Sequence, residues 1–297
     1  MALNYDVNKI NDMILRYLPE RTGLQATVFN AMDDAVIAGG KRIRPVLMYE
    51  TYKLFCRKNR KEIDDNVIAP FMAGMEVMHT ASLIHDDLPC MDNDTLRRGK
   101  PTTWVVYGED MATLAGDAMM IETFSLMSEA ALRSNEKDKA IKALYTMAKK
   151  SGLYGMTGGQ VVDVENTGKP LDNEKLDFIY RLKTGALLEA SMMIGAILGG
   201  AQDDETDKIE KIAADIGFAF QVRDDILDEI STNEQLGKPV HSDADNNKTT
   251  FVTLYGMDIA NQKVKSCSEE AMELLETIGG DTKVLKEIIS YLIDRDK

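Results

Sequence analysis

The chain has 297 residues, of which 44% are hydrophobic and 28% are charged, so it fits one large or two small globular domains. The formal net charge of −14 argues against a nucleic-acid partner, because phosphate backbones attract a basic face. The same charge repels a phosphorylated substrate, so a phosphate site here needs locally clustered cations. The apolar runs are too short to cross a bilayer, and we expect no membrane span.

Apolar residues at three- and four-residue spacing predict an almost entirely helical chain. The expected helices cover residues 1–18, 24–38, 46–55, 67–87, 108–132, 139–151, 176–200, 208–230, 255–277 and 283–294. No stretch shows the alternating pattern of a strand. Because no repeat, linker or change of composition is present, residues 1–297 are predicted to form one all-α domain.

The first residues lack a basic region followed by an apolar core, so we expect no signal peptide. Cys56, Cys90 and Cys267 lie far apart and lack metal-ligand spacing. An odd number of scattered cysteines favours reduced thiols and a cytoplasmic location.

A basic segment, GGKRIRP, separates the second and third expected helices. Its glycine pair ends one helix, and Pro45 suits the first turn of the next. Lys41, Arg42 and Arg44 lie between them. A solvated basic loop is one interpretation. The other is an anion cradle, in which glycine admits the ligand and the new helix N-terminus adds its positive end.

An acidic cluster follows the apolar helix that starts near Val67. It comprises Asp86, Asp87, Asp92 and Asp94, and it is followed by Arg97, Arg98 and Lys100. Pro89 cannot continue an undisturbed helix, so a bend is predicted that sets Asp92 back towards Asp86. Buried charges must be paired or must hold metal, so this is no packed core. Carboxylates that hold a divalent metal, beside arginines that hold phosphate, would account for the cluster.

A second acidic cluster ends the helix predicted over 208–230. Asp224 and Asp228 stand at i and i+4, about 6 Å apart, with Asp225 beside them. Like charges on one helix face repel unless a cation lies between them, and the helix dipole disfavours acids at this end. A solvated helix end is the alternative interpretation.

Three further segments are candidates for the same site. Lys183 and Thr184 interrupt an apolar helix, and this lysine either extends to solvent or reaches an anion in a pocket. The glycine-dense stretch 152–165 allows close helix packing or admits a flat apolar ligand. The polar loop 232–250 has the length of a lid, with Lys238 and Lys248 placed to cover an anion.

Two acidic clusters on separate helices can hold Mg²⁺ together with a diphosphate. The metal would neutralise a diphosphate leaving group, and a dry apolar cavity would protect the carbocation that remains on an allylic carbon. The sequence shows no Walker loop, no GxGxxG and no Ser–His–Asp set that would indicate another chemistry.

Taken together, these motifs resemble the short-chain trans-isoprenyl diphosphate synthases, the family of farnesyl and geranylgeranyl diphosphate synthases. The matching motifs run in order and at family spacing from about residue 39 to 256: GGKRIRP, HDDLPCMDNDTLRRGKPT, GMTGGQVVD, LKTGALLEAS, FQVRDDILD, LGKP and SDADNNKTT. The resemblance implies an all-α barrel of helices around a deep central cavity, the isoprenoid synthase fold, in a homodimer. It also implies a head-to-tail condensation of isopentenyl diphosphate with dimethylallyl, geranyl or farnesyl diphosphate, with three Mg²⁺ ions as cofactor.

The resemblance assigns roles by position. The isopentenyl diphosphate is expected to bind Lys41, Arg44, His79 and Arg98. The allylic diphosphate is expected to meet Arg97, Lys183, Thr184, Gln221, Lys238 and Lys248. Of these, the catalytic residues are Arg97, Lys183, Thr184 and Gln221, with Thr184 and Gln221 also steadying the cation. The Mg²⁺ ligands are Asp86, Asp92 and Asp224, with Asp87, Asp225 and Asp228 as partners. Trp104 departs from the family pattern.

The residues that set product length are expected to be Ala81 and Ser82. Farnesyl synthases of the bacterial type usually carry an aromatic residue five positions before the first Asp, about 7.5 Å along the helix. The small Ala81 leaves the cavity floor open, which predicts a product longer than C15, most simply C20. Alternatively another bulky side chain, such as Met119, Met120 or Phe124, closes the cavity and the product is farnesyl diphosphate.

Two rival functions use similar parts. A class I terpene cyclase also has an Asp-rich helix and Mg²⁺, but it needs no isopentenyl site, and GGKRIRP and Arg98 argue against it. A non-catalytic, synthase-like regulatory subunit should have lost acids or basic residues of the site, and both sets are present here.

Overall fold

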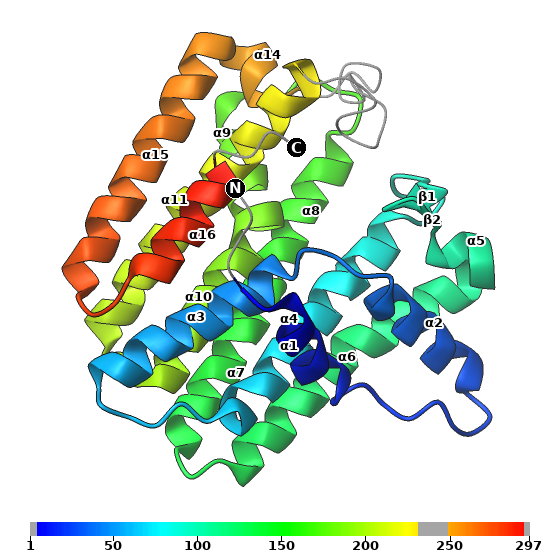
Figure 1. The fold of residues 1–297 in the computed structure, drawn as a ribbon. Coiled ribbons are helices and arrows are strands. Elements are labelled where there is room, and N and C mark those ends of the chain that lie inside the picture. Colours follow the sequence, from blue (N-terminus) through cyan, green and yellow to red (C-terminus); the bar gives the residue numbers. More distant parts are fainter. Residues whose placement is uncertain (1–4, 231–248, 294–297) are drawn as a thin grey trace.

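A computed structural model describes residues 5–230 and 249–293, and Figure 1 shows it as a ribbon. Most of this part of the chain is helical, which confirms the all-α prediction. The helices are α1 (Val7–Leu15), α2 (Ala26–Ile37), α3 (Ile43–Lys58), α4 (Asp65–Asp86), α5 (Thr103–Tyr107), α6 (Glu109–Arg133), α7 (Lys137–Ser151), α8 (Met156–Glu165), α9 (Asn173–Ile179), α10 (Ala186–Gly199), α11 (Asp203–Ile230), α14 (Phe251–Tyr255), α15 (Met257–Ile278) and α16 (Lys283–Ile293). A π-helix, Tyr180–Gly185, joins α9 to α10, and β1 (Leu96–Arg97) and β2 (Lys100–Pro101) form a short hairpin.

Helix α10 lies inside the bundle and packs against α3, α4, α7 and α11. Nearly every residue of α10 is buried, which explains its apolar sequence of Ala, Leu, Ile, Met and Gly. A Cβ at Gly195 would collide with the carbonyl oxygen of Met48. This glycine therefore lets the backbones of α10 and α3 come into direct contact.

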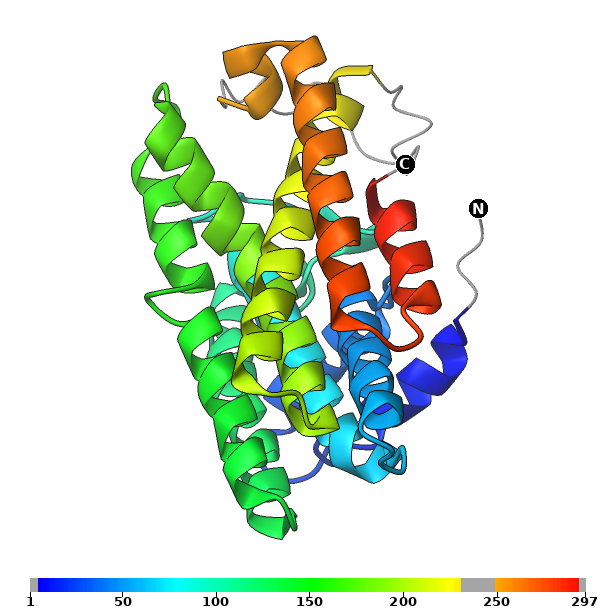
Figure 2. The same ribbon diagram turned by 90° about the vertical axis from the view of Figure 1, so that its left-hand side faces the viewer.

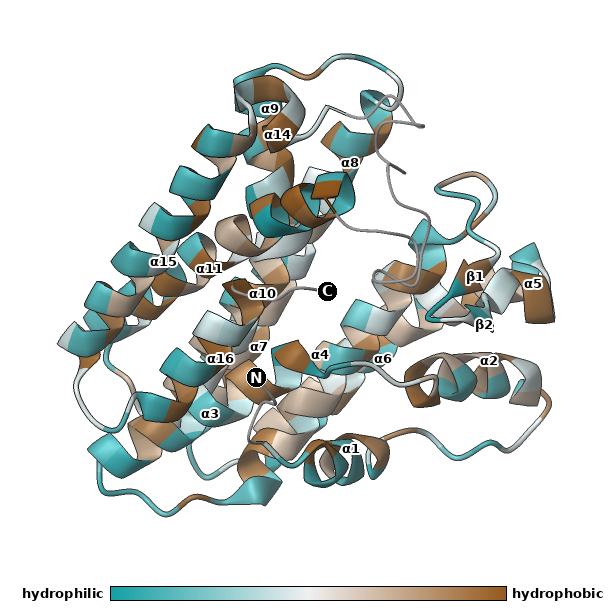
Figure 3. Cartoon of the chain, turned by 45° about the horizontal axis from the view of Figure 1, so that its top comes forward, coloured by the Kyte–Doolittle hydropathy of each residue, from teal (hydrophilic) through white to brown (hydrophobic). Residues whose placement is uncertain are grey.

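The methionine stripe of α4 belongs to the core. Met72, Met75 and Met78 are at most 2% exposed, which confirms the interpretation of the stripe as packing. Burying each such side chain stabilises the fold by about 1.5–3 kcal/mol. Figure 3 shows the matching outer pattern, in which hydrophilic residues cover the outward side of α15.

Helices α4 and α11 both run towards the end of the bundle where α8 and the hairpin lie (Figure 1). Both acidic clusters stand at the C-terminal ends of these helices. The topology therefore brings the two clusters to the same end of the molecule.

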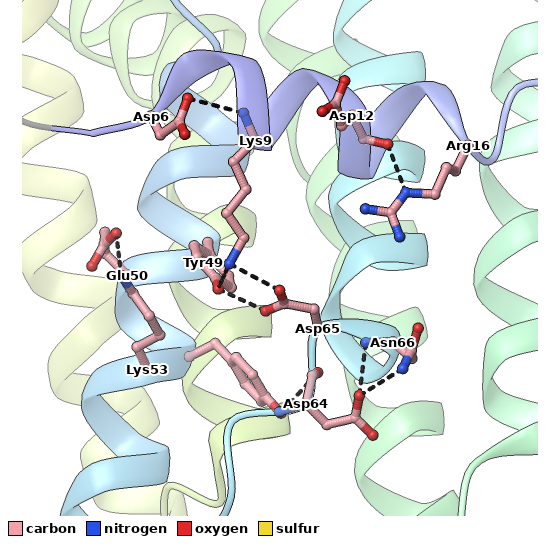
Figure 4. A network of polar contacts seen from close by, with 11 residues as sticks. Asp6, Lys9, Asp12, Arg16, Tyr49, Glu50, Lys53, Asp64, Asp65 and Asn66 are labelled. Atoms are coloured by element: carbon pink, nitrogen blue, oxygen red, sulfur yellow. Dashed lines mark hydrogen bonds and ion pairs between the residues drawn. The ribbon is translucent and has the colours of Figure 1, made fainter.

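A polar network ties the N-terminal helix to the bundle (Figure 4). Lys9 Nζ on α1 donates to the Tyr49 hydroxyl on α3 at 2.8 Å, and it lies 2.9 Å from Asp65 Oδ2 at the start of α4. The Tyr49 hydroxyl donates to Asp65 Oδ1 at 2.6 Å. Burial and the adjacent Asp65 raise the pKa of Tyr49. Burial opposes the ionisation of Asp65, but the hydrogen bonds from Tyr49 and Lys9 outweigh it and lower the pKa of Asp65.

The helix expected over 176–200 is present as one helical stretch, Asn173–Gly199, whose middle residues Tyr180–Gly185 form a π-helix. Two other segments differ from the prediction. Helix α8 forms in the glycine-dense stretch, where no helix was expected. The segment 96–101, expected as loop, forms the short hairpin. Its turn residues Arg98 and Gly99 both have positive φ, which is the turn geometry that suits a two-residue hairpin.

The expectation about membrane spans also needs correction. The helix Asp65–Asp86 and the helical stretch Asn173–Gly199 are long and apolar enough to cross a bilayer. In each, 78% of the most apolar window is buried inside the protein, as in the core helices of a globular fold. Among the described residues the three cysteines are free thiols.

Candidate functional site

The first acidic cluster forms where α4 ends. The backbone N–H of Asp92 donates to the Asp86 carbonyl oxygen at 2.8 Å, so the predicted return of the chain towards Asp86 is confirmed. Burial raises the pKa of Asp86 to about 6; the positive Lys183 opposes this rise and the negative Asp92 adds to it. The protein thus holds a buried carboxylate near a second one, an arrangement that a bound cation would stabilise.

The hairpin supplies a partner for the second aspartate of the motif. Asp87 is 3% exposed, and its Oδ1 lies 2.6 Å from Arg97 Nη2 and 2.8 Å from Arg97 Nε. The turn at Arg98 and Gly99 sets this geometry, because it directs the two neighbouring arginines to different partners. Asp87 therefore orients Arg97, which makes it a partner of the site and not an open metal ligand.

Trp104 has a role in the same loop. Its indole N–H donates to the Asp94 carbonyl oxygen at 2.8 Å, and the Thr102 hydroxyl donates to the same oxygen at 2.8 Å. Arg97 Nη2 lies 3.5 Å from the Asp94 carboxylate. These contacts tie α5 to the loop after Asp92, which accounts for the departure from the family pattern.

A cluster of basic side chains lies where the start of α3, helix α4 and the hairpin meet. Arg44 Nη1 lies 3.3 Å from His79 Nε2, and Arg98 donates to the Gly39 carbonyl oxygen. Burial, with the nearby positive Arg98, lowers the pKa of Arg44 to about 10. Burial and Arg44 also lower the pKa of His79 well below its usual value, so this histidine is neutral at pH 7. Arg44 Nε is buried without a hydrogen-bond partner in the described part of the chain. A bound anion would accept a hydrogen bond from Arg44 Nε and reduce the repulsion between Arg44 and Arg98.

Lys41 and Arg42 of the same segment have different environments. Lys41 is exposed, and its Nζ lies 5.7 Å from the ring centre of Tyr291. Arg42 is 5% exposed and has a positive φ of 51°, and its Nη1 lies 2.5 Å from the buried Glu76 Oε1. Arg42 therefore anchors the cradle loop to α4, whereas Lys41 lies at the surface beside Tyr291.

In the second acidic cluster, as in the first, one aspartate is bound to other elements of the protein. Asp225 is 5% exposed and accepts hydrogen bonds from the Tyr180 hydroxyl at 2.5 Å and from the Phe251 backbone N–H at 2.8 Å. It therefore joins α11 to the π-helix and to α14. Asp224 is half-buried and Asp228 is 7% exposed, one helical turn apart on α11.

The π-helix places the other predicted site residues. The Thr184 hydroxyl donates to Gln221 Oε1 on α11 at 2.8 Å. Lys183, Thr184, Gln221 and Asp225 line a pocket of about 140 Å³. The wider turn of a π-helix is often found at functional sites, and here it gives consecutive residues to one pocket.

Helix α8 connects the pocket to the first acidic cluster. Gln160 Nε2 donates to Asp86 Oδ1 at 2.8 Å, and Lys183 Nζ lies 2.5 Å from Asp163 Oδ2. A Cβ at Gly159 would collide with the backbone nitrogen of Lys183, so this glycine allows α8 to contact the π-helix directly. Of the two interpretations of the glycine-dense stretch, close packing explains Gly159.

The sequence did not indicate Gln160 and Asp163 as site residues. A signal was present: they stand at i and i+3, on the helix face that also carries Gly159. The link from Asp225 to Phe251 was also missed, because nothing in the sequence relates two residues so far apart.

Several predicted residues remain predictions. Lys238 and Lys248, with most of the predicted lid, lie outside the described residues. Ala81 is fully buried on α4, and the Ser82 hydroxyl donates to the His79 carbonyl oxygen at 2.9 Å.

Comparisons with known proteins agree with this geometry. The polyprenyl synthetase family model matches residues 25–292. The chain is 40% identical to a farnesyl diphosphate synthase of Geobacillus stearothermophilus, over 99% of this chain and 97% of that protein. It is 35% identical to a geranylgeranyl diphosphate synthase of Cyanophora paradoxa, over 97% of this chain and 93% of that protein.

A solved structure also shares the fold. It is a geranyltransferase from Helicobacter pylori, complexed with magnesium and isoprenyl diphosphate, with a TM-score of 0.80 and 28% identity. The match covers 99% of this chain and 98% of that one. The chain therefore belongs to the polyprenyl synthetase family and is a trans-prenyltransferase of the farnesyl and geranylgeranyl diphosphate synthase group.

Proposed function

We propose that the protein condenses isopentenyl diphosphate head-to-tail with an allylic diphosphate, extends the prenyl chain by five carbons and releases diphosphate. The observation that carries this proposal is the presence of two cationic regions at one end of the bundle. Arg44 and Arg98, with the neutral His79 beside Arg44, form one region, and the pocket of Lys183 forms the other. A reaction between two diphosphate substrates needs both cationic regions, whereas a terpene cyclase, which has one diphosphate substrate, needs one region.

The residues present fit Mg²⁺. The candidate ligands are carboxylate oxygens, which Mg²⁺ prefers, and the high pKa of Asp86 comes from burial without enough compensating positive charge. Within residues 5–230 and 249–293, no group of three His, Cys, Asp or Glu side chains could hold a metal ion unaided. This suits Mg²⁺, which takes few protein ligands and completes its shell with phosphate oxygens and water.

In the proposed reaction, three Mg²⁺ ions would be held by Asp86, Asp92 and Asp224. Bound there, they would neutralise the charge that develops on the leaving diphosphate. Arg97, oriented by Asp87, and Lys183 would bind the same diphosphate. Neutral His79, with Arg44 and Arg98, would hold the isopentenyl diphosphate so that its double bond meets the allylic carbon.

Thr184 and Gln221 are placed to steady the allylic cation. The Thr184 hydroxyl donates a hydrogen bond to Gln221 Oε1. The lone pairs of the Thr184 oxygen therefore stay available to face positive charge. The C–O bond between the allylic carbon and its diphosphate breaks, and the double bond of isopentenyl diphosphate forms the new C–C bond to that carbon. A proton then passes from the resulting cation to the released diphosphate, which completes the elongated product. Buried apolar faces would keep water from capturing the cation.

For the product we propose a chain longer than C15, most simply C20. The support is the small, fully buried Ala81, which stands five residues before Asp86. Met119 is fully buried, and Met120 and Phe124 are half-buried, so farnesyl diphosphate is the second candidate product if one of them closes the cavity.

We also propose a homodimer and a cytoplasmic location. Helix α6 exposes Leu114, Ile121 and Leu132, which are 50%, 71% and 76% exposed. The adjacent α7 exposes Ile141 and Tyr145. Figure 2 shows α7, in green, along one edge of the molecule. Exposed apolar residues at this spacing favour a second helical surface as partner.

The deciding experiment incubates the protein with Mg²⁺, isopentenyl diphosphate and dimethylallyl diphosphate, and measures diphosphate release and product chain length. We expect stoichiometric diphosphate and a C20 alcohol after dephosphorylation. Product formation from the allylic diphosphate alone would favour the cyclase. No release of diphosphate from the complete mixture would favour the regulatory subunit.

A further inference from the structure

Helix α8 contacts two groups of the site that have opposite charge. Its inner face carries Gly159, Gln160 and Asp163, and Gly159 packs directly against the backbone of Lys183. From this position Asp163 Oδ2 lies 2.5 Å from Lys183 Nζ, and Gln160 Nε2 donates to Asp86 Oδ1 at 2.8 Å. One short helix thus provides a partner for a phosphate-binding lysine and another for a metal-binding carboxylate.

The two groups would otherwise neutralise each other. Gln160 and Asp163 stand at i and i+3 on α8, so the groups they contact, Asp86 and Lys183, lie beside the same short stretch of helix. Opposite charges attract strongly in a partly buried site, because water screens them less there than in solution. A direct pair between Lys183 and Asp86 would remove the charge that each needs for its ligand.

We propose that Asp163 is a positioning residue that holds the Lys183 ammonium on the α8 side of the pocket and so keeps it from neutralising Asp86 before metal and diphosphate bind. Gln160 complements this role. Its amide gives Asp86 a hydrogen bond without adding a charge, so the carboxylate keeps its attraction for a cation. The inference rests on the proposed function, because it concerns Lys183 and Asp86 of the same site.

Charge and burial support this role for Asp163. Burial alone would lower the pKa of Lys183, but Asp163 and Asp86 outweigh it and raise the pKa, so the lysine stays charged. Both side chains of the pair are about one quarter exposed, at 24% and 28%. A substrate phosphate therefore has access to the ammonium while Asp163 holds it.

The test compares full-length Asp163→Asn with wild type in two measurements. The first is the binding of inorganic pyrophosphate in the presence of Mg²⁺, by titration calorimetry. The second is the condensation rate as a function of Mg²⁺ concentration. We expect the half-saturating Mg²⁺ concentration to rise roughly tenfold, since freed Lys183 competes with the metal for Asp86. Excess Mg²⁺ should restore most of kcat, and KM for isopentenyl diphosphate should not change.

Three further variants separate positioning from folding. Asp163→Glu keeps the charge and should approach wild type. Glu165→Gln removes an exposed charge from the same helix and should behave as wild type. Gln160→Met removes the donor to Asp86 without a change of size, and it should shift the Mg²⁺ dependence in the same direction as Asp163→Asn.

The proposal is overturned if Asp163→Asn keeps the wild-type Mg²⁺ dependence and pyrophosphate affinity. A loss of kcat that excess Mg²⁺ does not restore would also overturn it, since that result indicates a purely structural pair. If Asp163→Asn does not fold, an unchanged Mg²⁺ dependence in Gln160→Met decides against it. An inactive wild-type protein would contradict the proposed function, while the pyrophosphate titrations would still decide this inference.

Discussion

Ala81 is a single small residue on which the proposed product length depends. It is fully buried on α4, among larger side chains such as Met78. If Ala81 faces an open hydrocarbon cavity, a larger side chain enters empty space and blocks the growing chain. If Ala81 packs against neighbouring helices, the same side chain meets atoms and destabilises the fold. One substitution therefore distinguishes the two possibilities.

We expect Ala81→Tyr to shorten the product to C15 or C10 with little loss of stability. In a closed core, the extra volume would instead destabilise the protein by about 1–3 kcal/mol. Chromatography of the dephosphorylated products and thermal unfolding measure the two outcomes. Ala81→Ser is the control, because it leaves the site small. An unchanged product length in a folded Ala81→Tyr protein would show that the cavity ends elsewhere.

At the residue scale the sequence predicted those site positions that depend on local rules. Pro89 follows the end of α4 and prevents the helix from continuing, so the return of Asp92 towards Asp86 followed from backbone geometry. The pairing of Asp87 with Arg97 was not predictable, because it requires the hairpin turn to fix the arginine. A run of adjacent acids does not tell which carboxylate faces a metal and which faces a cation of the protein.

At the element scale, the contact between α8 and the π-helix decides the shape of the diphosphate pocket. Gly159 lies against the backbone of Lys183, and Gly217 on α11 lies against Gly185 at the end of the π-helix. The π-helix is thus held between two glycine contacts. The sequence predicted a helix here but not its π-helical turn, because apolar spacing does not show where neighbouring backbones widen a turn.

We expect Gly159→Ala to destabilise the fold by about 1–3 kcal/mol, since its methyl group would overlap the Lys183 backbone. The displacement should also raise KM for the allylic diphosphate more than KM for isopentenyl diphosphate. Urea unfolding and steady-state kinetics test both effects. Val164→Ala, on the exposed face of the same helix, serves as control. Equal changes in the two KM values would argue against a specific effect on the pocket.

The polar network of Lys9, Tyr49 and Asp65, which joins α1, α3 and α4, makes the free energy of unfolding depend on pH. In the folded state, hydrogen bonds from Tyr49 and Lys9 outweigh burial and lower the pKa of Asp65 below its usual value. Its ionised form therefore adds stability above pH 4, and this contribution is lost as the pH falls through the folded pKa.

We expect Asp65→Asn to lower the free energy of unfolding at pH 7 by less than about 1 kcal/mol, because the pair with Lys9 is more than one third exposed. The difference from wild type should shrink below pH 4. Urea unfolding at pH 7, 5 and 3.5 measures it. A difference that stays constant over this range would exclude ionised Asp65 as the source.

At the scale of the whole molecule, the apolar residues form two groups, one buried in the core and one exposed at the surface. The core around α10 was predictable as a helical bundle, because helical periodicity marks which faces are apolar. The packing partners of each face were not predictable from periodicity. The apolar residues Leu114, Ile121, Leu132, Ile141 and Tyr145 of α6 and α7 are at least half exposed, so most of their apolar surface is available to another surface.

Ile121 lies in the middle of the exposed stripe on α6 and is 71% exposed. A charge at the centre of a helical interface must be desolvated without a partner, so Ile121→Asp should weaken the proposed dimer by more than tenfold in Kd. Sedimentation velocity over a range of protein concentrations measures the change. Leu24→Asp places the same charge on a fully exposed residue outside this stripe and should leave the dimer intact. A wild-type protein that sediments as a monomer at all concentrations would contradict the homodimer. A dimer that persists in Ile121→Asp would place the interface on another face.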